Sequence, residues 1–262
     1  MIPTRHPAVA GAFYPADPGQ LHLSVQAYLH AAKELPDTPP KAIIAPHAGY
    51  VYSGPIAATV YKTLQTAKDT IRRVILIGPA HRVGFRGIAL SHAAVYASPL
   101  GDIPVDHEAY SLLNGLAYVG FLDEAHTHEH SLEVQLPFLQ EVLGSFSLVP
   151  LVAGEATPEQ VSEVLERLWQ DTATVLVISS DLSHYHDYAT AQRLDQATTL
   201  AIENLQPEAI SNESACGRVP VKGLLTLAKR KGWTAKTVDV RNSGDTAGNK
   251  DRVVGYGAYV FH

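Results

Sequence analysis

The feature that most constrains the fold is a set of short, nearly continuous apolar runs rich in β-branched residues. Three of them cover residues 42–45, 74–77 and 174–179. A strand that is apolar on both sides must be buried on both faces, which is typical of a parallel sheet covered by helices. The runs therefore predict an α/β fold.

Segments with helical periodicity alternate with these strands. Asp17 and Pro18 form an N-cap and first-turn signal for a helix over 18–33, and a capping box at 157–160 opens another that extends to 169. The other predicted helices cover 55–64, 132–143, 188–205 and 220–231, with a short one after Asp106. The other predicted strands cover 147–152, 234–240 and 255–261, with strands or a hairpin between 87 and 105.

No linker, repeat or low-complexity segment divides this pattern. We therefore expect one α/β domain over residues 1–262, with a central, largely parallel or mixed sheet flanked by helices on both faces.

Composition excludes several classes of function. The 26 acidic residues outnumber the 20 basic ones and give a net charge of −6, whereas nucleic-acid binders carry a basic excess. No apolar run approaches the roughly 18 residues that span a bilayer, and the first 19 residues hold four prolines where an export signal needs an apolar helix. The single cysteine cannot form an intrachain disulfide. We expect a cytoplasmic protein with neither nucleic-acid nor membrane partners.

Histidines follow the ends of the buried strands. The chain has 13 of them, and His47, His81 and His184 each come shortly after a predicted strand. Ligands of open α/β sheets bind at the carboxyl ends of the strands, and Pro46 and Pro79 stiffen the chain at two of these ends. One such histidine often only caps a loop. Three at one edge favour a site for metal binding or proton transfer.

Neighbouring polar residues extend this candidate site. Asp181 is close enough in sequence to accept the ring proton of His184 or to bind a metal itself. His126, His128 and His130 alternate along the chain, so an extended conformation would place all three on one face. An exposed loop explains the first two equally well. His130 directly precedes a predicted helix and can point its ring into the crevice.

Cys216 is the remaining candidate for chemistry. It lies just before a predicted helix, where the helix dipole and Arg218 would favour a thiolate that can bind a metal or attack carbon. The alternative is a small buried apolar residue. A nucleotide-type glycine-rich loop, a Gly-x-Ser-x-Gly elbow and a CxxC pair are all absent from the sequence, which argues against phosphoryl transfer and serine hydrolysis.

Several short motifs occur in a distinctive order along nearly the whole chain. They are Arg5-His6-Pro7, Ala10-Gly11, Phe13-Tyr14-Pro15, Ala45-Pro46-His47-Ala48-Gly49-Tyr50, Ser53-Gly54, Gly78-Pro79-Ala80-His81, Glu129-His130-Ser131-Leu132-Glu133, Ser179-Ser180-Asp181-Leu182-Ser183-His184, Cys216-Gly217-Arg218 and Gly255-Tyr256-Gly257. Together they resemble the Memo family, also called AmmeMemoRadiSam system protein B. That family is similar in fold to the class III extradiol dioxygenases.

The resemblance implies a metal held by His47, His81 and Cys216. It places three further residues beside the metal as catalytic candidates, namely His184, Asp181 and His130. In the dioxygenases two histidines and a glutamate hold Fe(II), and another histidine acts as acid and base. Here Cys216 stands where the glutamate is expected, and a thiolate favours softer metals such as Cu(I) or Zn.

Three hypotheses follow. The first is a non-haem iron oxidoreductase that acts with O2 on a phenolic or other small substrate, with His184 moving protons and Asp181 orienting it. The second is a non-catalytic metal-binding or redox-regulating protein that works with AMMECR-type and radical SAM partners. The third is a Cys216–His184 hydrolase that needs no metal. In the first two, we expect the rings of His47 and His81 to converge with Cys216.

Overall fold

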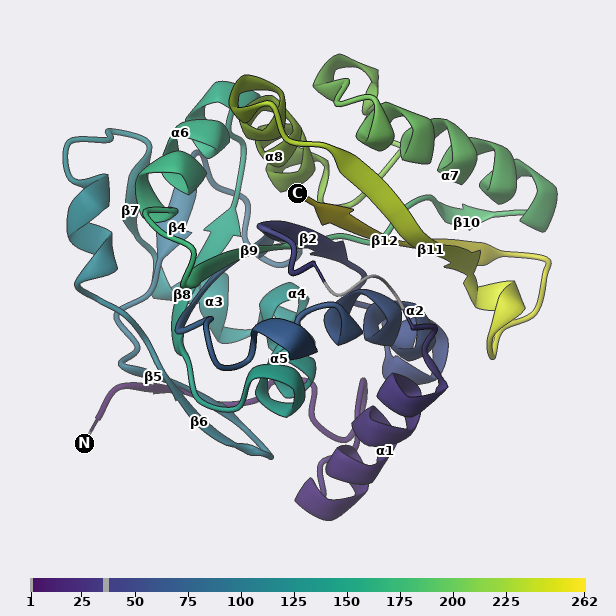
Figure 1. Cartoon of the computed structure of the whole chain (residues 1–262), viewed down its shortest axis with the longest axis horizontal. Helices are drawn as coiled ribbons and strands as arrows, with labels where there is room; N and C mark the ends of the chain where they lie inside the picture. The colour runs from purple at the N-terminus through teal and green to yellow at the C-terminus, as the bar shows by residue number, and fades with distance from the viewer. Residues whose placement is uncertain (1, 35–37) are drawn as a thin grey trace.

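The computed structural model describes residues 2–34 and 38–262, in which a nine-stranded mixed sheet lies between two layers of helices (Figure 1). The sheet has the order β10-β12-β2-β9-β3-β8-β4-β7, and β11 also pairs with β12. Its strands are β2 (Ala42–Ala45), β3 (Arg73–Pro79), β4 (Ile88–Leu90), β7 (Val119–Phe121), β8 (Ser147–Ala153), β9 (Thr174–Ser179), β10 (His184–His186), β11 (Ala235–Asn242) and β12 (Val253–Phe261). The predicted fold class is confirmed.

The centre of the sheet is parallel and its flanks are antiparallel. Strands β2, β9, β3 and β8 pair in parallel, whereas β12 is antiparallel to β2 and β4 is antiparallel to β8. Strand β9 lies between β2 and β3, so that Ala45 is level with Ser179 and Ile77 is level with Ile178. Three strands therefore end side by side at one edge of the sheet.

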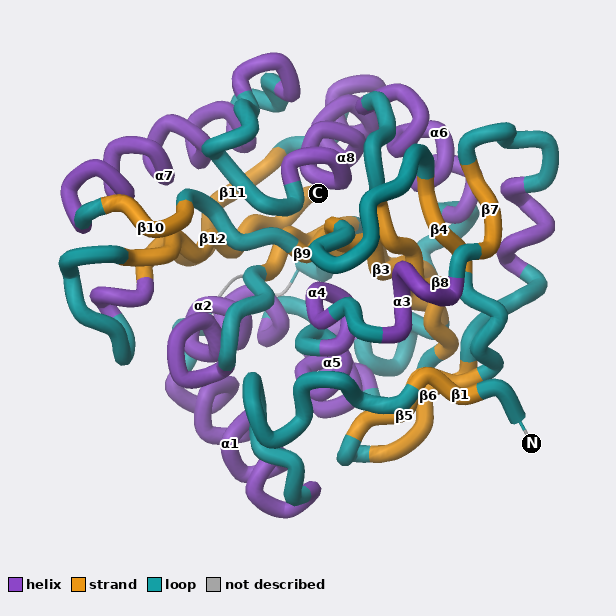
Figure 2. Tube along the Cα trace, turned by 180° about the vertical axis from the view of Figure 1, so that it is seen from behind, coloured by secondary structure: helices purple, strands orange, loops and turns teal. Residues whose placement is uncertain are grey.

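Helices cover both faces of the sheet, as Figure 1 and the reverse view in Figure 2 show. One layer contains α1 (Pro18–Ala31), α2 (Tyr50–Lys62) and α5 (Leu136–Leu143). The other contains α6 (Pro158–Leu168), α7 (Tyr188–Glu203) and α8 (Arg218–Lys231). Within the described ranges, no helix is both long and apolar enough to cross a membrane.

The central strands divide their side chains between two hydrophobic cores. In β2, Ile43 packs into the core beneath α1, α2 and α5, and Ile44 packs into the core beneath α6 and α8. Leu76 and Ile77 of β3 alternate in the same way. Because successive side chains of a strand point to opposite faces, two covered faces require a continuous apolar run.

The helix predicted over 55–64 begins earlier, at Tyr50, so Pro55 lies inside α2. Proline usually marks a first turn because it lacks an N–H, and that preference produced the wrong start. Here the missing hydrogen bond is the one to the carbonyl of Val51. That residue is exposed, and water can satisfy its carbonyl.

Two other predicted segments are divided in the structure. The helix predicted over 132–143 is split into α4 (His130–Glu133) and α5, because Pro137 starts a new helix. In the region 87–105, β4 joins the main sheet, whereas β5 (Val95–Ser98) and β6 (Gly101–Pro104) form a hairpin that pairs with β1 (Thr4–Arg5) in a separate sheet. The remaining short elements are α3 (Asp123–Thr127), η1 (Gln65–Ala67), η2 (Ala109–Leu113), η3 (Pro207–Ala209) and η4 (Ser243–Asp245).

A buried ion pair attaches the N-terminal segment to α4. The Glu133 carboxylate pairs with the Arg5 guanidinium, and both side chains are almost fully buried. The carboxylate also accepts the backbone N–H groups of Ala8 at 2.7 Å and Val9 at 2.9 Å, and the hydroxyl of Tyr14 at 2.6 Å. This set of donors compensates for the loss of water around the charge.

Glu133→Gln should destabilise the protein by about 3–5 kcal/mol, because the variant leaves the Arg5 charge buried without a counter-charge. Urea unfolding measures the change. Arg230→Gln is the matched control, since Arg230 pairs with Glu166 at the surface and its loss should cost less than about 1 kcal/mol. Equal losses of stability from the two substitutions would contradict the assignment of Arg5 and Glu133 as a buried ion pair.

Candidate metal centre

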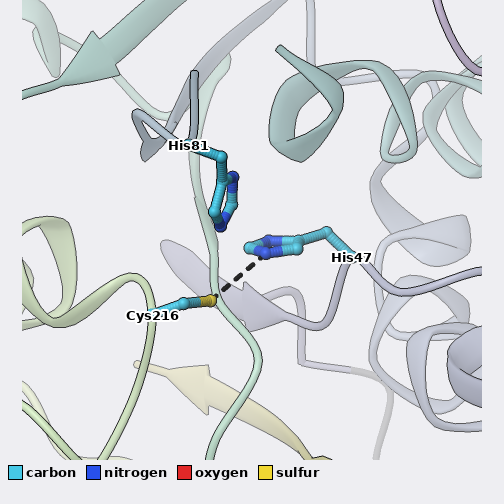
Figure 3. Close-up of side chains that lie close together, drawn as sticks. All are labelled: His47, His81 and Cys216. Carbon is cyan, nitrogen blue, oxygen red and sulfur yellow. Dashed lines mark hydrogen bonds between the residues drawn. The ribbon is translucent and has the colours of Figure 1, made fainter. Parts of the chain in front are cut away.

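Two strand ends and one helix start bring three metal-binding side chain types together. His47 follows β2, His81 follows β3, and Cys216 precedes α8. The rings of His47 and His81 are 5.2 Å apart between centroids, and one ligand atom from each of the three residues lies within 4.8 Å of the others. Figure 3 shows the three side chains pointing toward one another. The expected convergence is therefore present.

A chain of hydrogen bonds fixes the proton on the ring of His47. The hydroxyl of Ser179 donates its only proton to the Ser131 carbonyl at 2.6 Å, and it accepts from the Gln135 amide at 2.8 Å. It must therefore also accept from His47 Nδ1, at 2.8 Å. With its proton on Nδ1, the ring presents the Nε2 lone pair to the cleft. Burial lowers the pKa of His47 well below its usual value, which favours the neutral ring.

A buried carboxylate holds His81. Glu129 accepts the backbone N–H of His81 at 2.6 Å and its ring Nδ1–H at 2.8 Å, and it also accepts the backbone N–H of Ser131. Burial alone would raise the pKa of Glu129, but the hydrogen bonds from His81 and Ser131 hold it at about 2. Glu129, His81 and His130 form a second group of nearby ligand atoms. Because its oxygens are already engaged, Glu129 orients the imidazole.

Cys216 approaches β9 closely because the next residue is a glycine. A Cβ on Gly217 would lie 2.6 Å from the carbonyl oxygen of Ser179 and 2.6 Å from Ser180 Cβ. The thiol then lies 3.2 Å from His47 Nε2, the unprotonated nitrogen, to which it donates. Burial raises the pKa of Cys216 far above its usual value, so the thiolate expected from the helix dipole and Arg218 is not the form favoured without a cation.

Asp181 and His184 lie beside the three, but they are not partners of each other as the sequence suggested. Asp181 accepts the backbone N–H of His47 at 2.7 Å, whereas His184 Nδ1 donates to the carbonyl of Leu182 at 2.8 Å. Tyr185, the next residue, has a left-handed backbone conformation with a φ of 61°. Burial raises the pKa of Asp181 to about 7 and lowers the pKa of His184.

The three alternating histidines do not share one extended face, because α3 and α4 interrupt the segment. His126 is buried: its Nε2–H donates to the Ala89 carbonyl at 3.0 Å, and its Nδ1 accepts from the Tyr96 hydroxyl at 2.6 Å. His128 is exposed. His130 stacks on His81 with ring centroids 4.6 Å apart. Burial lowers the pKa of His130 to about 4.

These residues line one open cleft of about 900 Å³. All six candidate residues belong to its lining, namely His47, His81, His130, Asp181, His184 and Cys216. Phe13 and Tyr256 add aromatic surface to the wall. The cleft is large enough for an organic molecule next to the three ligand atoms.

Sequence reasoning missed the residues that hold the ligands in place. Ser179 and Glu129 stand inside the quoted motifs, but neither was singled out, and Gln135 lies outside them. The signal for Glu129 was its position immediately before His130. Ser179 ends a buried strand that is otherwise apolar, and a hydroxyl there requires a partner.

The arrangement defines an α/β protein with a histidine- and cysteine-lined cleft at the carboxyl edge of a mixed sheet. The crystal structure of an uncharacterized protein from Escherichia coli K12 is similar in fold, with a TM-score of 0.51. The match covers 82% of this chain and 98% of that chain at 16% identity, so the likeness concerns the fold alone.

Residues 5–260 match the family model described as Memo-like protein. The MEMO1 family proteins of Sulfolobus acidocaldarius and Aquifex aeolicus are each 35% identical to the chain. The matches cover 96% and 98% of this chain and 97% and 98% of those proteins, respectively. The chain belongs to the Memo family, and the resemblance inferred from its motifs is confirmed.

Ser179→Ala should weaken the binding of zinc, used as a probe metal, by about 10- to 100-fold, because the hydroxyl that orients His47 is lost. Competition with a chromophoric chelator measures the affinity. Ser162→Ala is the matched control, because Ser162 is equally buried but its hydroxyl has no hydrogen-bond partner among the described residues. A Ser179 variant that binds zinc like the control would show that His47 needs no such support.

Proposed function

We propose that the chain is a metal-dependent oxidoreductase whose single metal ion is held by His47, His81 and Cys216. Iron is the first candidate, and copper and zinc are the others. The observation that carries the proposal is the convergence of three ligand atoms within 4.8 Å at the wall of a cleft. The substrate is a small organic molecule, with a phenol as the first class to test.

The donor set fits a metal ion in charge and distance. Bonds of about 2.1 Å to nitrogen and about 2.3 Å to sulfur place two ligands of one ion at most about 4.4 Å apart, so only small side-chain movements are needed. The Nε2 lone pair of His47 is unprotonated, and His81 is oriented through its other nitrogen. A cation would also stabilise the thiolate that burial otherwise disfavours.

When bound, a redox-active ion would supply Lewis acidity and electron transfer. The chain's own residues would then manage protons. His184 lines the cleft with Nδ1 donating to Leu182, which leaves Nε2 as the atom able to take a proton from a substrate hydroxyl. Its lowered pKa keeps the ring neutral and available as a base at pH 7. His130 is a second neutral ring on the same wall.

A non-catalytic metal-binding or redox-regulating role, with AMMECR-type and radical SAM partners, is the second candidate. The thiol in the donor set favours it, because a thiolate replaces the carboxylate of the dioxygenases and selects softer metals. The hydrolase hypothesis has less support. The histidine that Cys216 contacts is His47 rather than His184, and burial favours the thiol over the nucleophilic thiolate.

Metal content and oxygen uptake together test the proposal. Protein purified without oxygen should contain about one metal ion per chain by elemental analysis. The iron-loaded form should then consume O2 with at least one member of a panel of catechols. One bound ion without oxygen uptake supports the binding role instead, and absence of metal after loading overturns both.

Cys216→Ser should retain the fold and bind zinc more weakly, because a neutral hydroxyl replaces a thiolate of similar size. The pH dependence gives a sharper test. Zinc must displace the thiol proton in the parent. The slope of log affinity against pH should therefore be steeper by about one in the parent than in the variant. Equal affinities and equal pH slopes, measured by chelator competition between pH 6 and 8, would remove Cys216 from the ligand set.

His184→Ala should retain the metal, because the proposed ligands are elsewhere, but lose about 100-fold or more in turnover, the usual contribution of a general base. Elemental analysis and O2 uptake are measured on the same preparation. His186→Ala is the control, because His186 lies two residues further along β10 and lines the same cleft. Loss of metal together with activity would make His184 a ligand.

A further inference from the structure

A second cleft lies on the other side of Cys216. It has a volume of about 410 Å³, and Cys216 belongs to the lining of both clefts. The end of β3 and the residues after it are also shared between the clefts. Pro79 and Ala80 line the second cleft, and His81 lines the first. Cys216 is therefore the candidate metal ligand that the two clefts share, and His81 directly follows residues that line the second.

The second cleft continues into a third, of about 510 Å³. Four residues line both, namely Arg86, Glu155, Arg218 and Val219. The third cleft extends along the start of α6 and reaches Lys222 on α8. We call the combined feature the basic groove; it is lined by Pro79, Ala80, 83–86, 153–158, Gln160, Cys216, Arg218, Val219 and Lys222.

The groove carries more positive than negative charge. Arg86, Arg218 and Lys222 face it, against the single carboxylate of Glu155. Arg86 and Glu155 are 3.9 Å apart and both exposed, which makes a weak pair. Within residues 2–34 and 38–262, neither Arg218 nor Lys222 has a carboxylate at ion-pair distance. Their donors are free for a ligand.

Guanidinium and ammonium groups with free donors bind carboxylates and phosphates, and a cleft of one charge raises the local concentration of the opposite ion. The cleft that Cys216 lines is also lined by small residues, Ala80, Gly84 and Gly154, which leave room for a molecule. The charged residues line the groove together with Cys216, which also lines the first cleft.

We propose that the basic groove is a second entrance to Cys216, one that admits small anions bearing carboxylate or phosphate groups. The first cleft would then serve the organic substrate, and the two reactants would approach the centre from opposite sides of the partition. The inference concerns access to the thiol and is independent of the metal. It can therefore fail or succeed separately from the proposed function.

The single cysteine of the chain makes the test clean, because thiol alkylation reports on Cys216 alone. Metal-free protein is treated with iodoacetate or with iodoacetamide, two reagents of similar size in which the thiolate displaces iodide. They differ in charge, so the ratio of their rates cancels any change in the pKa of the thiol. Mass spectrometry follows the rates.

The parent should show an iodoacetate-to-iodoacetamide ratio at least about tenfold higher than the double variant Arg218→Gln/Lys222→Gln, because the local anion concentration is lost. The parent's ratio should fall as ionic strength rises from about 0.01 to 1 M, since the Debye length shrinks from about 30 to 3 Å. Millimolar inorganic phosphate should slow alkylation of the parent more than that of the double variant.

Two further variants separate the routes. Arg252→Gln removes a cation that lines the first cleft and should leave the ratio unchanged. Gly84→Phe fills the second cleft at a position where an added Cβ meets nothing within 4 Å, so the fold should persist and both reagents should slow. A ratio that responds to Arg252→Gln alone, alkylation that Gly84→Phe does not slow, or no alkylation of the folded parent would overturn the proposal.

Discussion

The structure around the candidate site depends on the buried Glu133 carboxylate. It accepts hydrogen bonds from the Arg5 guanidinium, from two backbone N–H groups and from a tyrosine hydroxyl. A carboxylate buried without these donors would cost several kcal/mol. The same guanidinium donates to the carbonyls of Glu129 and His126, so it fixes the chain just ahead of α4. Glu129 in turn orients His81. The orientation of His81, one of the three candidate metal ligands, therefore depends on a charge pair that lies outside the cleft.

The order of the sheet explains why the candidate ligands meet. His47 and Asp181 are 134 residues apart in sequence, but β9 lies directly beside β2, and their ends carry both residues to one edge. One polar network then joins three segments. Gln135 donates to the Pro46 carbonyl and to the Ser179 hydroxyl, and that hydroxyl also holds the His47 ring. A parallel arrangement with another strand order would separate these groups.

Much of the fold could be predicted because the strands are buried on both faces and the helices are amphipathic, so periodicity carried the information. The predictions that were wrong concern the local conformation of short segments. Pro55 lies within a helix because the exposed face tolerates a lost hydrogen bond, and the 126–130 segment is helical although its histidines alternate. The state of Cys216 could not be predicted, because burial, a tertiary property, outweighs the effects of the helix start and Arg218.

The hydrogen bond between the Cys216 thiol and His47 Nε2 bears on how the proposed centre would take up an ion. Each ligand already has a partner in the folded chain, because the thiol and His47 bond each other and Glu129 holds His81. Both members of the thiol–imidazole pair are neutral, so the pair carries no buried charge repulsion. The unfolded chain offers no comparable chelate, since the two residues are 169 positions apart. If the proposed function holds, the folded protein would be a preassembled receptor that could release and recapture its ion without unfolding.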